Sequence, residues 1–150
     1  MPEAQTGSLP VLLLNGPNLN LLGEREQTIY GKQTFEAIED ELKQLARASG
    51  LELLSVQSNH EGVLIDQIQA ARNTTSGLII NPGGLTHTSV SLRDALLLYS
   101  KPKFEVHLSN IYTRESFRHH SLMSGAVDGV LCGFGVEGYK MALNALLKIF

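Results

Sequence analysis

Short apolar runs alternate along the chain with segments whose apolar residues recur every three or four positions. Continuous runs are typical of strands covered on both faces, and the longer spacing is typical of helices with one buried face. The runs predict five strands, at residues 11–14, 51–56, 77–80, 103–108 and 127–132. The helical spacing predicts four helices, at residues 35–49, 61–71, 89–99 and 136–150, the first between a cap at Thr34 and a stop at Gly50.

Strands that alternate with helices predict a parallel sheet with right-handed crossover connections. We therefore expect an α/β fold, namely a flavodoxin-like, doubly wound three-layer sandwich with a five-stranded parallel sheet. A chain of 150 residues without an internal linker is expected to form a single domain, residues 1–150, with a flexible tail at residues 1–8. That tail lacks the basic segment and the apolar segment that together mark a signal peptide.

The composition argues against several classes of partner. A formal net charge of −3 gives no support for nucleic-acid binding, and no apolar stretch approaches the roughly 20 residues of a membrane span. The single cysteine, Cys132, cannot form an internal disulfide and fits a reducing compartment, so we expect a cytoplasmic protein. Because Cys132 lies in an apolar run, we expect it to be buried as a small hydrophobic residue. The pair His119 and His120 lacks the spacing of zinc motifs, so no metal is expected.

Four loops are expected on one rim of the sheet, because ligands of such folds bind outside the carboxyl ends of the strands. These loops follow Leu14, Ile80, His107 and Cys132. The first of them, residues 15–33, is long for a connection between a strand and a helix, which is typical of a lid or a binding loop. It lacks both the G-x-G-x-x-G and the Walker A spacing of nucleotide-binding loops.

Arg25 and Tyr30 are the two candidate chemical groups in this long loop. Arg25 could clamp an anion, or it could favour the ionised form of Tyr30 by lowering a phenol pKa that is ordinarily about 10. The alternative is an arginine paired with a neighbouring glutamate and a tyrosine that packs the loop down. The residues alone leave both interpretations open.

The third predicted strand ends in Asn81, and the amides of Gly83 and Gly84 offer donors where the next helix is expected to begin. His87 lies where its side chain can reach the same space. The alternative is ordinary capping of the helix by Thr88 or Ser89, which does not require the sequence Asn-Pro-Gly-Gly before it. We therefore favour a binding role for this turn.

The fourth predicted strand alternates strictly between apolar and polar residues, which places Glu105 and His107 on one face. Histidine is suited to proton transfer near neutral pH, and Glu105 could orient its ring and fix its tautomer. The alternative is a histidine that is only a hydrogen-bonded part of the structure. Arg114 and Arg118 follow four residues apart, so we expect them to share a helix face and to suit a carboxylate or a phosphate.

The remaining candidate residues limit the classes of reaction that the site could catalyse. Arg93 and Asp94 lie in the middle of the third predicted helix and are expected to form an exposed ion pair. No serine lies in a G-x-S-x-G sequence and no lysine lies at the rim, which disfavours hydrolase and Schiff-base chemistry. A rim with tyrosine, histidine and arginine suits proton abstraction beside a carbonyl, followed by acid-assisted loss of a leaving group.

Several motifs together resemble those of the type II 3-dehydroquinate dehydratases, in order and spacing, over residues 9–147. They lie at residues 15–19, 22–23, 25–26, 30–31, 81–89, 93–95, 105–110, 114–118 and 133–139. The resemblance implies a flavodoxin-like fold and a cofactor-free dehydration of 3-dehydroquinate to 3-dehydroshikimate through an enolate. It leaves open whether that reaction serves aromatic amino acid biosynthesis or quinate catabolism.

The resemblance also implies five catalytic residues. Tyr30 would remove the proton at C2, and Arg25 would lower the pKa of Tyr30 and stabilise the transition state. His107 would protonate the departing C1 hydroxyl, and Glu105 would orient His107. Asn18, which belongs to the first motif, completes the set.

The resemblance also implies substrate-binding residues in several loops. Asn81 would position a water that stabilises the enolate oxygen, and Leu108 and Ser109 would hold the substrate carboxylate. His87 and Arg118 would bind ring hydroxyls, and Gly83 and Gly84 belong to the same binding site. The family forms trimers that assemble into dodecamers, and Asp94 would reach the site of a neighbouring subunit. That role replaces the exposed ion pair expected from the residues alone.

Two segments depart from the family pattern. Gln27 stands where proline is frequent, and residues 123–125 read Met-Ser-Gly where Ile-Ser-Pro is more frequent. The first difference affects the stiffness of the loop and the second affects subunit contacts. A function of another class, a flavodoxin-like module that binds an anion or a nucleotide without catalysis, is disfavoured by the missing phosphate-loop spacing.

Overall fold

The computed structural model describes residues 9–24 and 33–149. Arg25, Gln27 and Tyr30, together with the tail expected at residues 1–8, lie outside the described residues. Within the described residues, no helix is both long enough and apolar enough to cross a membrane.

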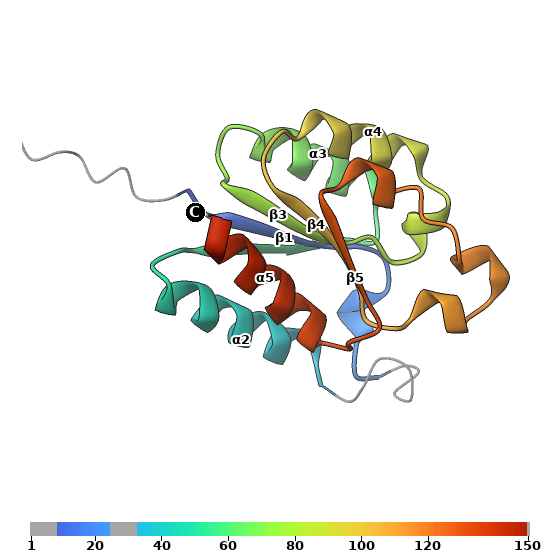
Figure 1. The fold of residues 1–150 in the computed structure, drawn as a ribbon, viewed down its shortest axis with the longest axis horizontal. Helices are drawn as coiled ribbons and strands as arrows, with labels where there is room; N and C mark the ends of the chain where they lie inside the picture. The colour runs from blue at the N-terminus through green and yellow to red at the C-terminus, as the bar shows by residue number, and fades with distance from the viewer. Residues whose placement is uncertain (1–8, 25–32, 150) are drawn as a thin grey trace, which may run out of the picture.

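Five parallel strands form one sheet in the order β2-β1-β3-β4-β5. The strands are β1 (Val11–Asn15), β2 (Leu53–Gln57), β3 (Gly77–Asn81), β4 (Lys103–His107) and β5 (Gly129–Cys132). The helices are α2 (Phe35–Ala48), α3 (Glu61–Ala71), α4 (Val90–Leu98) and α5 (Glu137–Ile149). Figure 1 shows α2 and α5 covering one face of the sheet and α3 and α4 covering the other. The predicted three-layer α/β sandwich with five parallel strands is confirmed.

The core consists of two apolar layers, one on each face of the sheet. Leu13 and Ile79 belong to the layer under α2 and α5, whereas Leu14 and Ile80 belong to the layer under α3 and α4. Every residue of β1 and β3 is buried. Central strands with two covered faces explain why these segments read as continuous apolar runs in the sequence.

The strand register brings the polar strand ends to one edge of the sheet. Asn15, the last residue of β1, pairs in register with Asn81 at the end of β3, and His107 at the end of β4 pairs with Cys132. Asn15, Asn81 and His107 are nearly inaccessible to solvent, unlike ordinary polar residues at strand ends. This edge of the sheet therefore gathers buried polar groups that can carry out chemistry.

Strand β2 begins two residues later than predicted. Gly50 adopts a φ of 77°, and the amide of Leu51 donates to the carbonyl oxygen of Ala46 over 3.0 Å. Leu51 thus belongs to the end of α2, where a left-handed glycine lets the following amides bond back to the last turn. An apolar residue in this position is indistinguishable by pattern from the first residue of a strand.

Short 3₁₀ helices occupy several connections that the sequence pattern did not assign. The segment η2 (Gly83–His87) separates β3 from α4, so the Asn-Pro-Gly-Gly turn leads into a 3₁₀ helix and not directly into an α-helix. Three more, η3 (Ile111–Thr113), η4 (Ser116–Arg118) and η5 (Ser124–Ala126), connect β4 with β5. The expectation that Arg114 and Arg118 share a helix face is therefore wrong, because Arg114 follows η3 and Arg118 ends η4.

Candidate active site

A cavity opens at the carboxyl edge of the sheet, between the loops that follow β1, β3 and β4. Its described lining residues are Pro17, Asn18, Leu19, Leu22, Asn81, Gly83, Gly84, His87, His107, Leu108, Ser109, Ile111, Arg114 and Arg118. Most of the residues predicted for the site thus line one cavity. Glu105 and Asp94 do not line it, and Arg25 and Tyr30 lie outside the described residues.

His107 faces this cavity with a buried carboxylate behind it. Alternation along β4 places Glu105 on the same face of the strand, and the Glu105 Oε2 atom contacts the Nε2 atom of His107. Glu105 has no solvent exposure and His107 is 6% exposed. A contact through Nε2 leaves Nδ1 as the ring nitrogen that can serve a ligand.

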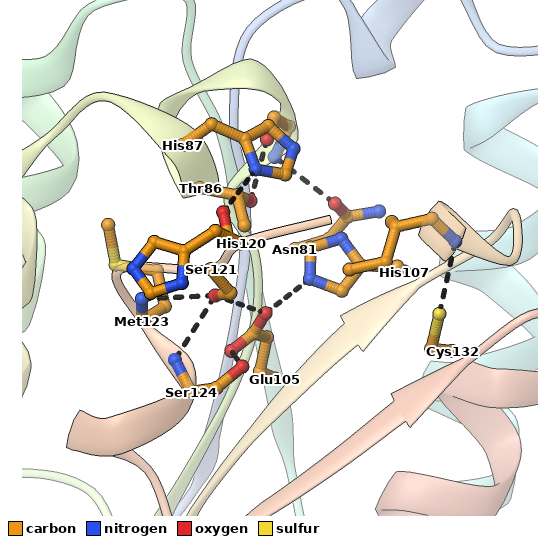
Figure 2. Close-up of polar contacts among 12 residues, drawn as sticks. Asn81, Thr86, His87, Glu105, His107, His120, Ser121, Met123, Ser124 and Cys132 are labelled. Carbon is orange, nitrogen blue, oxygen red and sulfur yellow. Dashed lines mark hydrogen bonds and ion pairs between the residues drawn. The ribbon is translucent and has the colours of Figure 1, made fainter. Parts of the chain in front are cut away.

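Two serines hold the Glu105 carboxylate from the other side. Ser121 Oγ donates to Glu105 Oε2 and Ser124 Oγ donates to Oε1, each over 2.9 Å. Figure 2 shows this carboxylate with His107 on one side and the two serines on the other. Burial alone raises the pKa of Glu105, but the hydrogen bonds and charge of His107 and the two serine bonds outweigh it and bring the pKa below its ordinary value. The carboxyl is therefore ionised at neutral pH.

His87 approaches the same cavity from η2. Its Nδ1 atom lies 2.8 Å from the carbonyl oxygen of His120. Since a carbonyl only accepts, Nδ1 carries the proton, and Nε2 of the neutral ring is an acceptor. Burial lowers the pKa of His87, and the charges of His107 and Arg118 lower it further, against the raising effects of the His120 carbonyl and Glu105. The neutral ring is thus favoured.

Asn81 is held by a buried tyrosine and by its own turn. Its Nδ2 atom donates to the hydroxyl of Tyr139 over 3.0 Å, and that hydroxyl donates to Oδ1 of Asn15. Burial raises the pKa of Tyr139, so the phenol remains protonated. The amide of Gly83 donates to Oδ1 of Asn81 over 3.2 Å, so this amide is occupied and is not the free donor expected from the sequence.

Cationic side chains form the rim of the cavity. Arg118 Nε lies 2.6 Å from Oε2 of Glu115, which tethers the guanidinium at the edge of η4. Arg114 Nη1 lies 3.4 Å from the hydroxyl of Ser109, which also lines the cavity. Two arginines beside a serine hydroxyl suit an anionic substrate group such as a carboxylate.

Asn18 lies at the opposite side of the cavity, in a left-handed conformation with a φ of 72°. Its amide donates to Oδ1 of Asn59 over 3.0 Å. Asparagine tolerates this backbone conformation better than most residues, which explains its place at the start of η1 (Leu19–Leu21). Asn59 joins β2 to the site, and no motif in the sequence predicted that contact.

Asp94 lies on the exposed face of α4, away from the cavity of its own chain. The predicted ion pair with Arg93 is absent although both residues are described, because Arg93 Nη1 donates instead to the carbonyl oxygen of Leu122 over 2.7 Å. Cys132 is half-buried and not buried as expected. Its Sγ atom accepts from the amide of Ile111 over 3.3 Å.

Sequence reasoning missed the residues behind the cavity. Ser121, Ser124, Asn15 and Tyr139 were given no role, although each bonds to a side chain that faces or supports the site. Asn15 and Tyr139 lay within family motifs, but a polar residue at a strand end and an aromatic ring in an apolar helix are equally typical of ordinary structure. The described residues contain no group of three or more histidine, cysteine, aspartate or glutamate side chains suited to a metal ion.

Comparisons with known proteins place this geometry among enzymes of one family. The family model for class II dehydroquinases matches residues 9–147. A 3-dehydroquinate dehydratase of Herminiimonas arsenicoxydans is 55% identical over 139 residues, which cover 92% of this chain and 96% of the relative. A catabolic 3-dehydroquinase of Penicillium rubens is 52% identical over 134 residues, covering 89% of this chain and 86% of the relative. The crystal structure of a type II dehydroquinase from Propionibacterium acnes superposes with a TM-score of 0.91 at 39% identity, covering 94% and 97% of the two chains.

Proposed function

Since the chain belongs to the class II dehydroquinase family and is a hydro-lyase that dehydrates 3-dehydroquinate, we propose that His107 is the general acid of this reaction. The observation that carries the proposal is the pair of His107 and ionised Glu105 at the wall of a cavity with a cationic rim. A histidine backed by a carboxylate can hold a proton on one ring nitrogen and deliver another from the second.

The proposed reaction begins with proton abstraction. Tyr30, as its phenolate, removes the proton at C2 of the substrate and leaves an enolate. Arg25 favours that phenolate by its charge and stabilises the transition state. The enolate then expels the C1 hydroxyl, which takes a proton from His107 and departs as water. The product is 3-dehydroshikimate, with a double bond conjugated to the carbonyl.

The residues that line the cavity support binding of different substrate groups by different side chains. Ser109 and the backbone of Leu108, beside Arg114, would hold the substrate carboxylate, and His87 and Arg118 would bind ring hydroxyls. One amide hydrogen of Asn81 is used by Tyr139, and the second is free for a water that faces the enolate oxygen. The backbone of Gly83 and Gly84 would close the floor of this site, and Asn18 would act from the opposite wall.

The same proposal includes assembly with further copies of the chain. Val90, Leu97 and Leu98 are each more than half exposed and lie on α4 with Asp94. Residues three, four or eight positions apart share a helix face, so Asp94 is part of an apolar stripe that fits a neighbouring subunit. The stripe supports a dodecamer assembled from trimers, in which Asp94 enters the site of the neighbouring subunit. The cytoplasmic location rests on the single cysteine.

Direct turnover tests the function. Purified protein mixed with 3-dehydroquinate should produce the ultraviolet absorbance of a conjugated enone. Tyr30→Phe and His107→Ala should each lower kcat by orders of magnitude, since each removes a proton-transfer group. Near-normal turnover in either variant contradicts the role given to that residue.

Borohydride provides the mechanistic control. An enolate mechanism forms no imine with the protein, so borohydride added together with substrate should leave the activity intact. Inactivation would contradict the enolate route. Absent turnover combined with tight binding of a nucleotide or a flavin would instead favour the non-catalytic binding module.

A further inference from the structure

The carboxylate of Glu105 is surrounded by donors that fix where the proton of the Glu105–His107 pair resides. Its Oε2 atom contacts His107 and accepts from Ser121, and its Oε1 atom accepts from Ser124. Neither serine lines the cavity, so neither contacts substrate. Figure 2 shows both serines behind the carboxylate, on the side away from His107.

The direction of the Ser121 bond follows from the other bonds of its hydroxyl. The amides of Met123 and Ser124 donate to Ser121 Oγ over 3.0 and 3.1 Å, and these two bonds occupy both lone pairs. The one hydroxyl hydrogen is then left for Glu105, which must accept it. Because both oxygens of the carboxyl accept from serines, its ionised form is favoured, and the shared proton is assigned to Nε2 of His107.

We propose that Ser121 and Ser124 are positioning residues that keep Glu105 ionised and thereby hold His107 in the tautomer whose Nδ1 faces the substrate. The inference rests on the proposed role of His107 as the general acid. It gives a role in orienting His107 to two hydroxyls that do not line the cavity.

The segment that carries the serines is itself anchored near the other site residues. The amide of Leu122 donates to the carbonyl oxygen of Thr86 over 2.8 Å, and Arg93 Nη1 donates to the carbonyl oxygen of Leu122. Among residues 9–24 and 33–149, the other charged or titratable groups that face the pair are His87 on η2 and the cavity arginines, Arg114 and Arg118. These groups stay unchanged when a serine is substituted, so a changed titration of His107 reports the serine alone.

Ser124 is the cleaner probe of the two. Ser121 also caps the turn through two amides, whereas the Ser124 hydroxyl donates to Glu105. Ser124→Ala removes this donor, and Ser124→Thr restores a hydroxyl. Ser76→Ala is the matched control, because Ser76 is also half-buried and its hydroxyl donates to the carbonyl oxygen of Leu9, away from the site.

Loss of one donor leaves more negative charge on the carboxylate, which favours the protonated imidazole and makes His107 a weaker acid. We expect kcat of Ser124→Ala to fall about tenfold with KM changed less than about twofold, since the affected group acts on the reaction and not on binding. The limb of the kcat profile that reports His107 should move to higher pH. Ser124→Thr should recover most of kcat, and Ser76→Ala should match the wild type.

A second readout does not depend on turnover. The His107 ring signal, identified by its loss in His107→Ala, can be titrated by NMR in the resting protein. Its midpoint should rise in Ser124→Ala by about half a pH unit or more and stay unchanged in Ser76→Ala. An unmoved titration together with wild-type kcat in Ser124→Ala overturns the inference while leaving the proposed function intact. A moved titration in a protein that does not turn over 3-dehydroquinate supports the inference and contradicts the proposed function.

Discussion

Glu105 is a fully buried carboxylate, and its bonds determine how the protein responds to acid. Its pKa in the folded protein lies below the ordinary value of 4.5, because His107 and the two serine donors outweigh the effect of burial. The folded state therefore binds this proton less readily than the unfolded chain. The stabilisation is complete above the ordinary pKa and is lost as the pH falls through the lowered value.

We accordingly predict that Glu105→Gln lowers the free energy of unfolding at pH 7 and flattens its dependence on pH below about 4.5, since the depressed carboxyl is gone. Urea unfolding midpoints measured from pH 7 to pH 3 test this. Glu52→Gln, which changes an exposed glutamate before β2, should keep the dependence of the wild type. Parallel curves for Glu105→Gln and the wild type would refute the assignment.

The buried hydroxyl of Tyr139 bridges Asn81 and Asn15, so its removal leaves two buried amide groups without this partner. We predict that Tyr139→Phe costs about 1–3 kcal/mol of unfolding free energy. It should also lower kcat, because Asn81 loses its fixed orientation. Chemical denaturation and turnover measure the two effects.

Tyr99→Phe is the matched control for this substitution. Tyr99 is equally buried, and its hydroxyl lies 2.8 Å from Thr75 Oγ, away from the cavity. It should lose stability and keep kcat. Equal losses of kcat in the two variants would show that Tyr139 acts only through stability.

At this scale, the contact between Glu105 and His107 was predictable because the two-residue period of a strand puts them on one face. The hydrogen bonds that hold Glu105 and Asn81 from behind were not predictable. Ser121 and Ser124 lie 16 and 19 residues from Glu105, and Tyr139 lies 58 residues from Asn81. No local period connects residues across several turns, so these contacts depend on how the chain packs.

Between the elements, the loops after β1 and β3 cross in close contact. A Cβ atom at Gly16 would lie 2.3 Å from the carbonyl oxygen of Pro82, and the amide of Gly16 donates to the carbonyl oxygen of Asn81. We predict that Gly16→Ala destabilises the protein by at least about 3 kcal/mol, because main chain must move. Thermal or urea unfolding measures the loss.

Gly62→Ala is the control for Gly16→Ala, because it makes the same substitution at a position with open space. Gly62 lies in α3, and a Cβ there would meet no atom within 4 Å. Gly62→Ala should stabilise the protein by up to about 1 kcal/mol, since alanine favours the helix. A wild-type unfolding midpoint in Gly16→Ala would contradict the close approach.

The elements themselves were largely predictable where burial imposes a long, regular pattern. The five strands and four α-helices follow apolar periodicity, and their observed bounds differ from the predicted ones by at most two residues. The 3₁₀ helices were not predicted, because each spans a turn or two and is held by tertiary bonds such as Leu122 to Thr86. The mistaken helix for Arg114 and Arg118 arose for this reason.

In the whole molecule, the apolar stripe on α4 predicts self-association. Leu98 is 59% exposed beside Asp94. Leu98→Glu places a charge in the proposed interface, so the mass measured by light scattering should fall. Turnover should fall with it, because in the proposed assembly each site would lose the Asp94 of its neighbour. The circular dichroism spectrum should remain that of a folded chain.

Ile149→Glu changes a similarly exposed apolar residue on α5, in the other helical layer. It should leave both mass and turnover at their wild-type values. If Leu98→Glu keeps the mass of the wild type, the stripe on α4 is not the interface.

The close contact between the loops after β1 and β3 also limits which mutations could make this enzyme resistant to an inhibitor. Because Gly16 lies against Pro82 and Gly83 lies against Pro17, neither glycine has room for a side chain, and the floor of the cavity at Gly83 and Gly84 is main chain. A synthetic ligand that packs against this main chain would keep its contact through most substitutions that leave the fold intact. Resistance would have to arise at the rim, near Arg118, where the proposed grip on the natural substrate is lost as well.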